Sequence, residues 1–316
     1  MPGKSLSRSI ETSSNHSFAS WVGHPQKVAR RRHARIDNDV LALSVTVTLA
    51  LLVMIGVPLG AILPRKYVVP LPVNILVPFY VYPNPGAWDR LLEACIRHPA
   101  TNFTVILSID HGPGNTAWPS GIYIKPIERL NSLPNVRTIG YVDTAYGSRD
   151  QMSVVKEIET YAGWENSSTA ISGIFFDHTP AQEADNARAY LKNVSATVRH
   201  SQGFREPSIV VHNPGNVPSQ NMISYHADIT IIFDGEFKNM PDENILGTRL
   251  RELSGNRQDY AEVIHSMPRT ISRGDMRKAI NRARKNVGWL YITDRVGENK
   301  FECYSDRWEE FLDLTW

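Results

Sequence analysis

A long uncharged stretch near the N-terminus constrains this chain more than any other feature. Residues 40–63, VLALSVTVTLALLVMIGVPLGAIL, are 24 residues without a charged side chain. A bilayer core of about 30 Å is crossed by about 20 helical residues. Gly56 and Pro58 are compatible with such a helix, because both residue types are commoner in membrane helices than in soluble ones. A buried core helix rarely stays apolar for this length, so the run predicts a transmembrane helix over residues 40–63.

The charges that flank this run predict its orientation. Lys27, Arg30, Arg31, Arg32 and Arg35 precede it, whereas only Arg65 and Lys66 follow it. Because basic residues stay on the cytosolic side, we expect a single-pass type II membrane protein whose C-terminal domain is lumenal or extracellular. A cleaved signal peptide has a shorter apolar region behind a shorter basic one. A nuclear localisation signal at RRRHAR explains less of the pattern.

The segment before the run differs in charge from the rest of the chain. Residues 1–39 carry a net charge of +4, whereas the whole chain of 316 residues carries +2, which leaves −2 for the remainder. The segment has few large apolar side chains, so it is predicted to be a disordered basic cytosolic tail. The remainder has no basic stripe that could displace counterions from phosphates, and no nucleic-acid partner is expected.

The remaining 250 residues, 67–316, have the usual size of one eight-stranded β/α barrel. Short apolar runs alternate there with helical patterns, which indicates parallel strands joined by crossover helices. An open doubly wound sheet shares this alternation, but eight strands in such a length favour a closed, TIM-like (β/α)8 barrel. The predicted strands are residues 74–80, 103–109, 136–142, 171–176, 208–212, 228–233, 260–265 and 289–292.

Helix predictions are clear for only some of the connections. Apolar residues at helical spacing predict helices near residues 88–96 and 155–161, and propensity predicts two more within 180–200 and 273–286. The connection after His212 is short and rich in Pro and Gly, so no helix is evident there.

Polar and aromatic residues follow nearly every predicted strand. The active site of a β/α barrel lies at the C-terminal strand ends, so these side chains should share one mouth. Converging carboxylates with tyrosines nearby suit glycoside hydrolysis, in which one carboxyl group protonates the leaving oxygen and another attacks or activates water. For any single aspartate, the alternative is a helix cap. The residues are Tyr80, Tyr82, Asp110, His111, Tyr141, Asp143, Asp177, His178, His212, Asn213, Asp234, Glu236, His265, Thr293 and Asp294.

Signatures of other chemistries are missing from the sequence. It has no GxSxG elbow, no GxxxxGK[ST] or GxGxxG loop and no HExxH pair. No cofactor is therefore expected. A metal-dependent hydrolase stays open as an alternative, with a metal held by Asp110, His111, Asp177, His178 and His212.

Two cysteines and three sequons bear on the compartment. Cys95 lies on the first predicted helix and Cys303 just past the eighth strand, elements that become neighbours when a barrel closes. A disulfide between them and a buried core thiol at Cys95 are both open interpretations. The sequons at Asn102, Asn166 and Asn193 fit a glycosylated lumenal domain.

Several sequence blocks resemble a known family. They are VPFYVYP at 77–83, GPG at 112–114, GYVDTAYGSR at 140–149, GIFFD at 173–177, and HNPG with YHADITIIFD between 212 and 234. From about residue 73 onward the chain resembles the spherulation-specific family 4, or spherulin-4-like, proteins of fungi. Some members are membrane-anchored β/α-barrel hydrolases that cut α-1,4-linked N-acetylgalactosamine in the polysaccharide galactosaminogalactan. The resemblance thus implies a carbohydrate-active barrel.

The resemblance also implies catalytic positions. In active members the fourth strand ends in Asp-Glu and the sixth in Phe-Glu; here Asp177 matches, His178 replaces the first Glu and Asp234 the second. The change from Glu to Asp withdraws the carboxyl group by one methylene, and Glu236 lies two residues further on the same strand face. His178 can transfer protons, but its charged form is a cation and cannot act as a carboxylate nucleophile.

Two functions from different classes follow. The leading one is a membrane-anchored glycosidase of a hexosamine polysaccharide, with Asp177 and Asp234 as the carboxylate pair and His178 as a proton-transfer or orienting group. The other is a non-catalytic cell-surface or secretory-pathway protein that binds glycan in the same cleft. In both, the predicted sugar-binding residues are Tyr82, Asp110, Tyr141, Asp143, Asn213 and Glu236.

Overall fold

The computed structural model describes residues 43–50 and 70–316, except residues 166–167, 185, 224–226, 254 and 316. The chain divides into two units, Met1–Tyr67 and Val68–Trp316. In the first unit, residues 43–50 are helical and exposed. The predicted tail, and the predicted span apart from these eight residues, lie outside the described residues. Within the described ranges, no helix combines the length and apolar character needed to cross a membrane.

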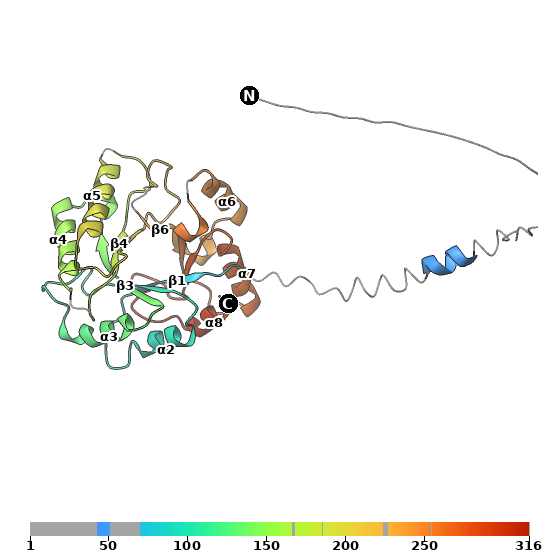
Figure 1. Cartoon of the computed structure of the whole chain (residues 1–316), viewed down its shortest axis with the longest axis horizontal. Helices are drawn as coiled ribbons and strands as arrows, with labels where there is room; N and C mark the ends of the chain where they lie inside the picture. The colour runs from blue at the N-terminus through green and yellow to red at the C-terminus, as the bar shows by residue number, and fades with distance from the viewer. Residues whose placement is uncertain are drawn as a thin grey trace, which may run out of the picture. The chain divides into compact units, whose positions relative to one another are not determined.

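Eight parallel strands close into a barrel, in chain order, with helices around it (Figure 1). Pairing of Asn74 with Trp289 and of Ile75 with Leu290 joins the last strand to the first. Each predicted strand is present, with ends shifted by at most a few residues. The strands are β1 (Asn74–Phe79), β2 (Phe103–Leu107), β3 (Val136–Asp143), β4 (Gly173–Asp177), β5 (Ile209–His212), β6 (Ile229–Glu236), β7 (Tyr260–His265) and β8 (Trp289–Ile292).

Helices cover the outside of the barrel. The four predicted helices correspond to α2 (Asp89–Arg97), α4 (Gln151–Ala162), α5 (Ala187–His200) and α7 (Arg273–Ala283). Three more helices, which no clear sequence pattern predicts, are α3 (Gly121–Asn131), α6 (Glu243–Arg251) and α8 (Trp308–Leu314). The connection from β5 to β6 has no helix in its described residues, as its Pro- and Gly-rich sequence predicts.

The core explains why the strands read as continuous apolar runs. Every residue of β2, FTVIL, is buried, because one strand face lines the barrel interior and the other packs on helices. Leu91 on α2 and Ile158 on α4 are completely buried among the residues of this core.

Two motif glycines are required by close packing. A Cβ at Gly140 would lie 2.6 Å from the ring of Tyr161 on α4, whose hydroxyl donates to the carbonyl of Tyr141 at 3.1 Å. Gly173 has a φ of +147°, and a Cβ there would lie 1.9 Å from the carbonyl oxygen of Ile209. Only glycine allows these approaches, which accounts for the first residue of the GYVD and GIFFD blocks.

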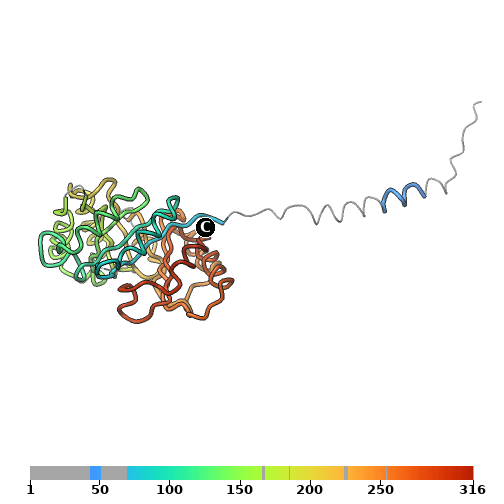
Figure 2. Tube along the Cα trace, turned by 90° about the horizontal axis from the view of Figure 1, so that it is seen from below, coloured from blue at the N-terminus to red at the C-terminus, as the bar shows by residue number. Residues whose placement is uncertain are grey.

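The two ends of the barrel unit lie side by side in both views (Figures 1 and 2). Arg257 donates to the carbonyl of Pro72 at 2.8 Å and to that of Arg284 at 3.2 Å. Arg284 in turn donates to the carbonyl of Leu314 at 3.1 Å. These arginines join the start of β1 to the end of α8.

The disulfide interpretation of the cysteines is wrong. Both thiols are free, since Cys95 is buried on α2 whereas Cys303 is exposed. Burial raises the pKa of the Cys95 thiol to about 12. Cys95 is therefore the unreactive core thiol of the alternative interpretation.

Candidate active site

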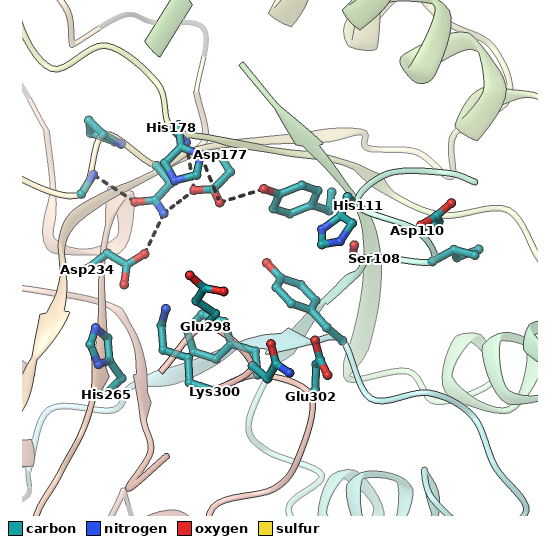
Figure 3. A pocket seen from close by; sticks show the side chains of 18 of the residues that line it. Ser108, Asp110, His111, Asp177, His178, Asp234, His265, Glu298, Lys300 and Glu302 are labelled. Atoms are coloured by element: carbon teal, nitrogen blue, oxygen red, sulfur yellow. Dashed lines mark hydrogen bonds and ion pairs between the residues drawn. The ribbon is translucent and has the colours of Figure 1, made fainter. Parts of the chain in front are cut away.

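The C-terminal strand ends surround a cleft of about 920 Å³. Figure 3 shows Asp177, Asp234 and His178 on one side of it and Glu298 and Lys300 on the other. The polar strand ends thus converge, as a barrel requires. The sequence-predicted residues that line the cleft are Tyr80, Asp110, His111, Tyr141, Asp177, His178, Asn213, Asp234 and His265.

Asp177, the last residue of β4, accepts hydrogen bonds on both of its carboxylate oxygens. The hydroxyl of Tyr141 donates to Oδ2 at 3.1 Å. The side-chain amide of Asn213 and the backbone N–H of His178 donate to Oδ1, at 2.8 and 2.9 Å. The side chain keeps 16% of its surface exposed. An ionised carboxylate can only accept, so these donors suit it in that form while it still faces the cleft.

Asn213, directly after β5, links the two predicted catalytic carboxylates. Its Nδ2 donates to Oδ1 of Asp177 at 2.8 Å and to Oδ2 of Asp234 at 2.9 Å. Because both bonds start at one nitrogen, these two oxygens lie no more than about 5.7 Å apart, and the planar amide group sets them at roughly 5 Å. Oδ1 of Asn213 accepts from the backbone N–H of Gly215 at 3.0 Å, which fixes the amide orientation.

Asp234 differs from Asp177 in its electrostatic surroundings. Burial raises the pKa of Asp234, and the negative charge of Asp177 raises it further. The hydrogen bond from Asn213 and the charges of Lys300 and His178 oppose this, without cancelling it. One carboxyl group of the pair therefore holds its proton to a higher pH than an ordinary aspartate does.

Two tyrosines form the wall beside Asp177. Burial and the charge of Asp177 raise the pKa of Tyr80 and of Tyr141 well above the ordinary value. Their rings meet edge to face with centroids 5.6 Å apart. Both hydroxyls thus stay protonated and can donate hydrogen bonds at neutral pH.

His178 is tied to a second aspartate. Its Nδ1 lies 2.9 Å from Oδ1 of Asp143 and 3.8 Å from Oδ2 of Asp177. Burial lowers the pKa of His178, but the two carboxylates outweigh burial and the net shift is upward. Asp143 does not line the cleft itself; it orients His178, and it also accepts from the backbone N–H of Ala145 at 3.0 Å.

Three predicted sugar-binding residues, Tyr82, Asp143 and Glu236, lie outside the cleft lining. Tyr82 is 55% exposed and packs edge-on against Tyr123, with centroids 6.0 Å apart. Glu236 pairs with Lys238 at 2.7 Å, and this contact lowers the pKa of its carboxyl group. β6 does continue to Glu236, but the carboxylate is engaged outside the cleft and does not replace the glutamate of the family pattern.

Other predicted strand-end residues have structural roles. His212 is buried, and its Nε2 lies 2.9 Å from Oγ of Ser195 on α5. Asp294 is buried and accepts from the backbone N–H of Asp306 at 3.0 Å. With His212 turned away from the mouth, the five residues of the metal alternative do not meet. Across the described residues, no three His, Cys, Asp or Glu side chains are grouped so as to hold a metal ion.

Sequence reasoning missed two parts of the lining. Tyr146 follows β3 by three residues, and residues 298–302 come from the long connection between β8 and α8. Glu298 points toward the centre of the cleft, with Lys300 beside it (Figure 3). A prediction limited to the first one or two residues after each strand does not include Tyr146 or residues 298–302. The GYVDTAYGSR block that contains Tyr146 was the available signal.

The comparisons with known proteins agree with this geometry. The sequence profile of spherulation-specific family 4 matches residues 74–315. Spherulin-4 of Physarum polycephalum is 26% identical over 225 residues, which cover 71% of this chain and 64% of that protein, so the chain spans under two thirds of this relative's length. The crystal structure of Aspergillus clavatus Sph3 in complex with GalNAc is 35% identical, with a TM-score of 0.72, and covers 78% of this chain and 98% of that one. The chain, from β1 to α8, therefore belongs to spherulation-specific family 4.

Proposed function

We propose that this chain is a glycoside hydrolase of a hexosamine-containing polysaccharide, with Asp177 and Asp234 as its carboxylate pair. The amide of Asn213, which donates to both, carries the proposal. It holds the two carboxylate oxygens that it bonds at roughly 5 Å, whereas retaining glycosidases place their carboxyl groups about 5–5.5 Å apart and inverting ones about 6.5–9.5 Å. This spacing supports hydrolysis with retention at the anomeric carbon.

The surroundings of the pair support an assignment of roles. Asp177, with donors on both oxygens and an open side facing the cleft, attacks the anomeric carbon. Asp234, whose pKa burial raises, gives its proton to the leaving glycosidic oxygen. Once ionised, Asp234 takes a proton from water, and the resulting hydroxide releases the sugar from Asp177.

The charge of the cleft favours the transition state of this reaction. Apart from histidines, its charged residues are Asp110, Asp177, Asp234, Glu298, Glu302 and Lys300, so negative charge predominates. Positive charge develops on the sugar ring as the glycosidic bond breaks, and a negative lining stabilises it.

The substrate class follows from similarity. Sph3 of Aspergillus clavatus, which shares the fold and 35% of the residues, was crystallised with GalNAc. We propose α-1,4-linked N-acetylgalactosamine or galactosamine polymers as substrates. Incubation of the full-length chain with these polymers, followed by chromatography of released oligosaccharides, tests the proposal. Loss of products in Asp177→Asn and in Asp234→Asn supports it, and unchanged release by either variant contradicts it.

A second candidate function is glycan binding without turnover. Its support is His178, which replaces the glutamate of the family pattern and pairs with Asp143. Such a protein would bind the same oligosaccharides in calorimetry while releasing no product over long incubation. Product release that depends on Asp177 excludes it.

We also propose that residues 40–63 anchor the chain in a membrane with its N-terminus in the cytosol. The support is the uncharged run and the basic residues before it. In intact microsomes, the C-terminal domain should resist added protease until detergent is present. Digestion without detergent contradicts this orientation.

A further inference from the structure

Tyr146 is the most exposed aromatic side chain in the cleft lining. It keeps 67% of its surface exposed, although the ring borders the same space as Asp177 and Asp234. Most of this side chain is therefore open to contact with a molecule bound in the cleft. Tyr80 and Tyr141 differ, because their rings pack into the wall and the hydroxyl of Tyr141 serves Asp177.

The backbone holds Tyr146 in an unfavourable conformation. Ala145 and Tyr146 have φ values of 45° and 56°, and Gly147 follows at 79°. Residues other than glycine rarely adopt this left-handed conformation. Where they do, the surrounding structure holds them in it, and they are common at active sites and ligand-binding sites. From this turn, Tyr146 lines the cleft.

Hydrogen bonds to the end of β4 keep this turn in place. The backbone N–H of Tyr146 donates to the carbonyl of His178 at 2.6 Å. The hydroxyl of Thr144 donates to the carbonyls of Asp177 and His178, at 3.0 and 2.7 Å. The turn that carries Tyr146 is therefore bonded to Asp177, the proposed nucleophile, and to the residue that follows it.

The rings of Tyr146 and His178 also contact each other. Their centroids lie 5.2 Å apart at an interplanar angle of 46°. His178 is itself fixed by Asp143 at 2.9 Å and has a left-handed φ of 47°. One aromatic wall thus leads from the Tyr146 ring to the Asp177 carboxylate.

We propose that Tyr146, backed by His178, is a stacking platform for the sugar unit that adjoins the cleaved bond. A pyranose ring has an apolar face of C–H groups, which packs on the face of an aromatic ring while its hydroxyl groups reach polar side chains. The platform deepens the proposed function and rests on it. His178 then supports the ring that receives the sugar.

The test removes the ring without disturbing the turn. In the full-length chain, Tyr146→Asn and Tyr146→Gly place residues that tolerate a positive φ at this position. Tyr146→Phe keeps the ring and loses only the hydroxyl. Tyr82→Asn is the matched control, because Tyr82 is a similarly exposed tyrosine outside the cleft lining.

Calorimetry with an α-1,4-linked GalNAc oligosaccharide, with Asp177→Asn in every chain to prevent turnover, gives the readout. We expect Tyr146→Asn and Tyr146→Gly to weaken binding about tenfold, with Tyr146→Phe and Tyr82→Asn unchanged. Unchanged affinity in the two variants without a ring overturns the proposal. So does an equal loss in Tyr146→Phe, since the hydroxyl would then be the binding group.

Failure of the platform and failure of the proposed function give different results. If the unaltered chain binds or cleaves the glycan and Tyr146→Asn binds it with the same affinity, only the platform is wrong. If the unaltered chain neither binds nor cleaves any hexosamine polymer, the proposed function is wrong and the platform falls with it.

Discussion

Replacing Asn213 by alanine removes the side-chain amide that donates hydrogen bonds to both Asp177 and Asp234. The change removes two hydrogen bonds to carboxylates, at 2.8 and 2.9 Å, each worth about 1.5–3 kcal/mol. When both carboxyl groups are ionised, it also leaves two charges roughly 5 Å apart without a shared donor, and their repulsion is then about 3 kcal/mol at an effective dielectric constant of 20. We expect kcat to fall about 10–100-fold, because the pair relaxes away from its working geometry.

The same substitution should move the pH dependence in a defined direction. The hydrogen bond from Asn213 lowers the pKa of Asp234, against the raising effects of burial and of Asp177. Without it, the pair retains its shared proton to a higher pH. Since the acid must be protonated to act, the alkaline limb of the kcat profile should move to higher pH.

The assay is product release from an α-1,4-linked GalNAc oligosaccharide over a range of pH, with Asn299→Ala as the matched control. Asn299 lines the same cleft, and in the described structure its side chain makes no bond to Asp177 or Asp234. The control should keep the alkaline limb of the profile. A normal rate and an unmoved alkaline limb in Asn213→Ala would refute the shared-donor account.

Three further predictions concern the family pattern and the fold. His178→Glu combined with Asp234→Glu restores that pattern and should raise product release about tenfold or more, because the second carboxyl group regains a methylene of reach; no gain contradicts the alignment of these positions. Gly140→Ala should lower the free energy of unfolding by about 1–3 kcal/mol, since its Cβ meets the ring of Tyr161 at 2.6 Å, and urea titration measures this. Burial raises the pKa of Glu262 on β7 from 4.5 to about 7, so the folded state binds this proton more tightly than the unfolded state does. Stability therefore falls as the pH rises between these two values. Glu262→Gln should remove a penalty of about 3 kcal/mol above pH 7, and an unchanged pH dependence of the free energy of unfolding contradicts this prediction.

The strands could be predicted from the sequence because burial on both faces makes most of them nearly continuous apolar runs. Helices were predictable where an apolar stripe or a run of strong helix formers stands out. α3 contains Pro126, and α6 contains Gly247 among mostly polar residues, so neither has an evident helical pattern. α8 follows the eighth strand by a long connection and has no counterpart in a strand-by-strand prediction.

The site residues that lie at the C-terminal ends of strands could be predicted from the sequence. Asp177, Asn213 and Asp234 lie at or just past apolar runs, and barrel closure brings such residues together. The sequence could not reveal that one amide nitrogen serves both carboxylates, because this depends on the turn that Gly215 fixes. Tyr146 was missed for a similar reason, since its entry into the cleft depends on left-handed backbone at residues 145–147.

Glu236 and Tyr82 show the limit of strand-end reasoning. Both have the expected residue type, yet each side chain contacts a neighbour outside the cleft lining. Glu236 pairs with Lys238, and Tyr82 packs against Tyr123. Which neighbour a side chain contacts depends on the tertiary structure, and the spacing of residues in the sequence does not reveal it.

The stereochemistry of hydrolysis tests the central claim most directly. With Asp177 and Asp234 held at the retaining distance, proton NMR of an α-1,4-linked GalNAc oligosaccharide incubated with the full-length chain should show the α-anomer as the first product. Asp177→Asn should abolish the signal. A β-anomer as the first product, or equal cleavage by Asp177→Asn, would contradict the account.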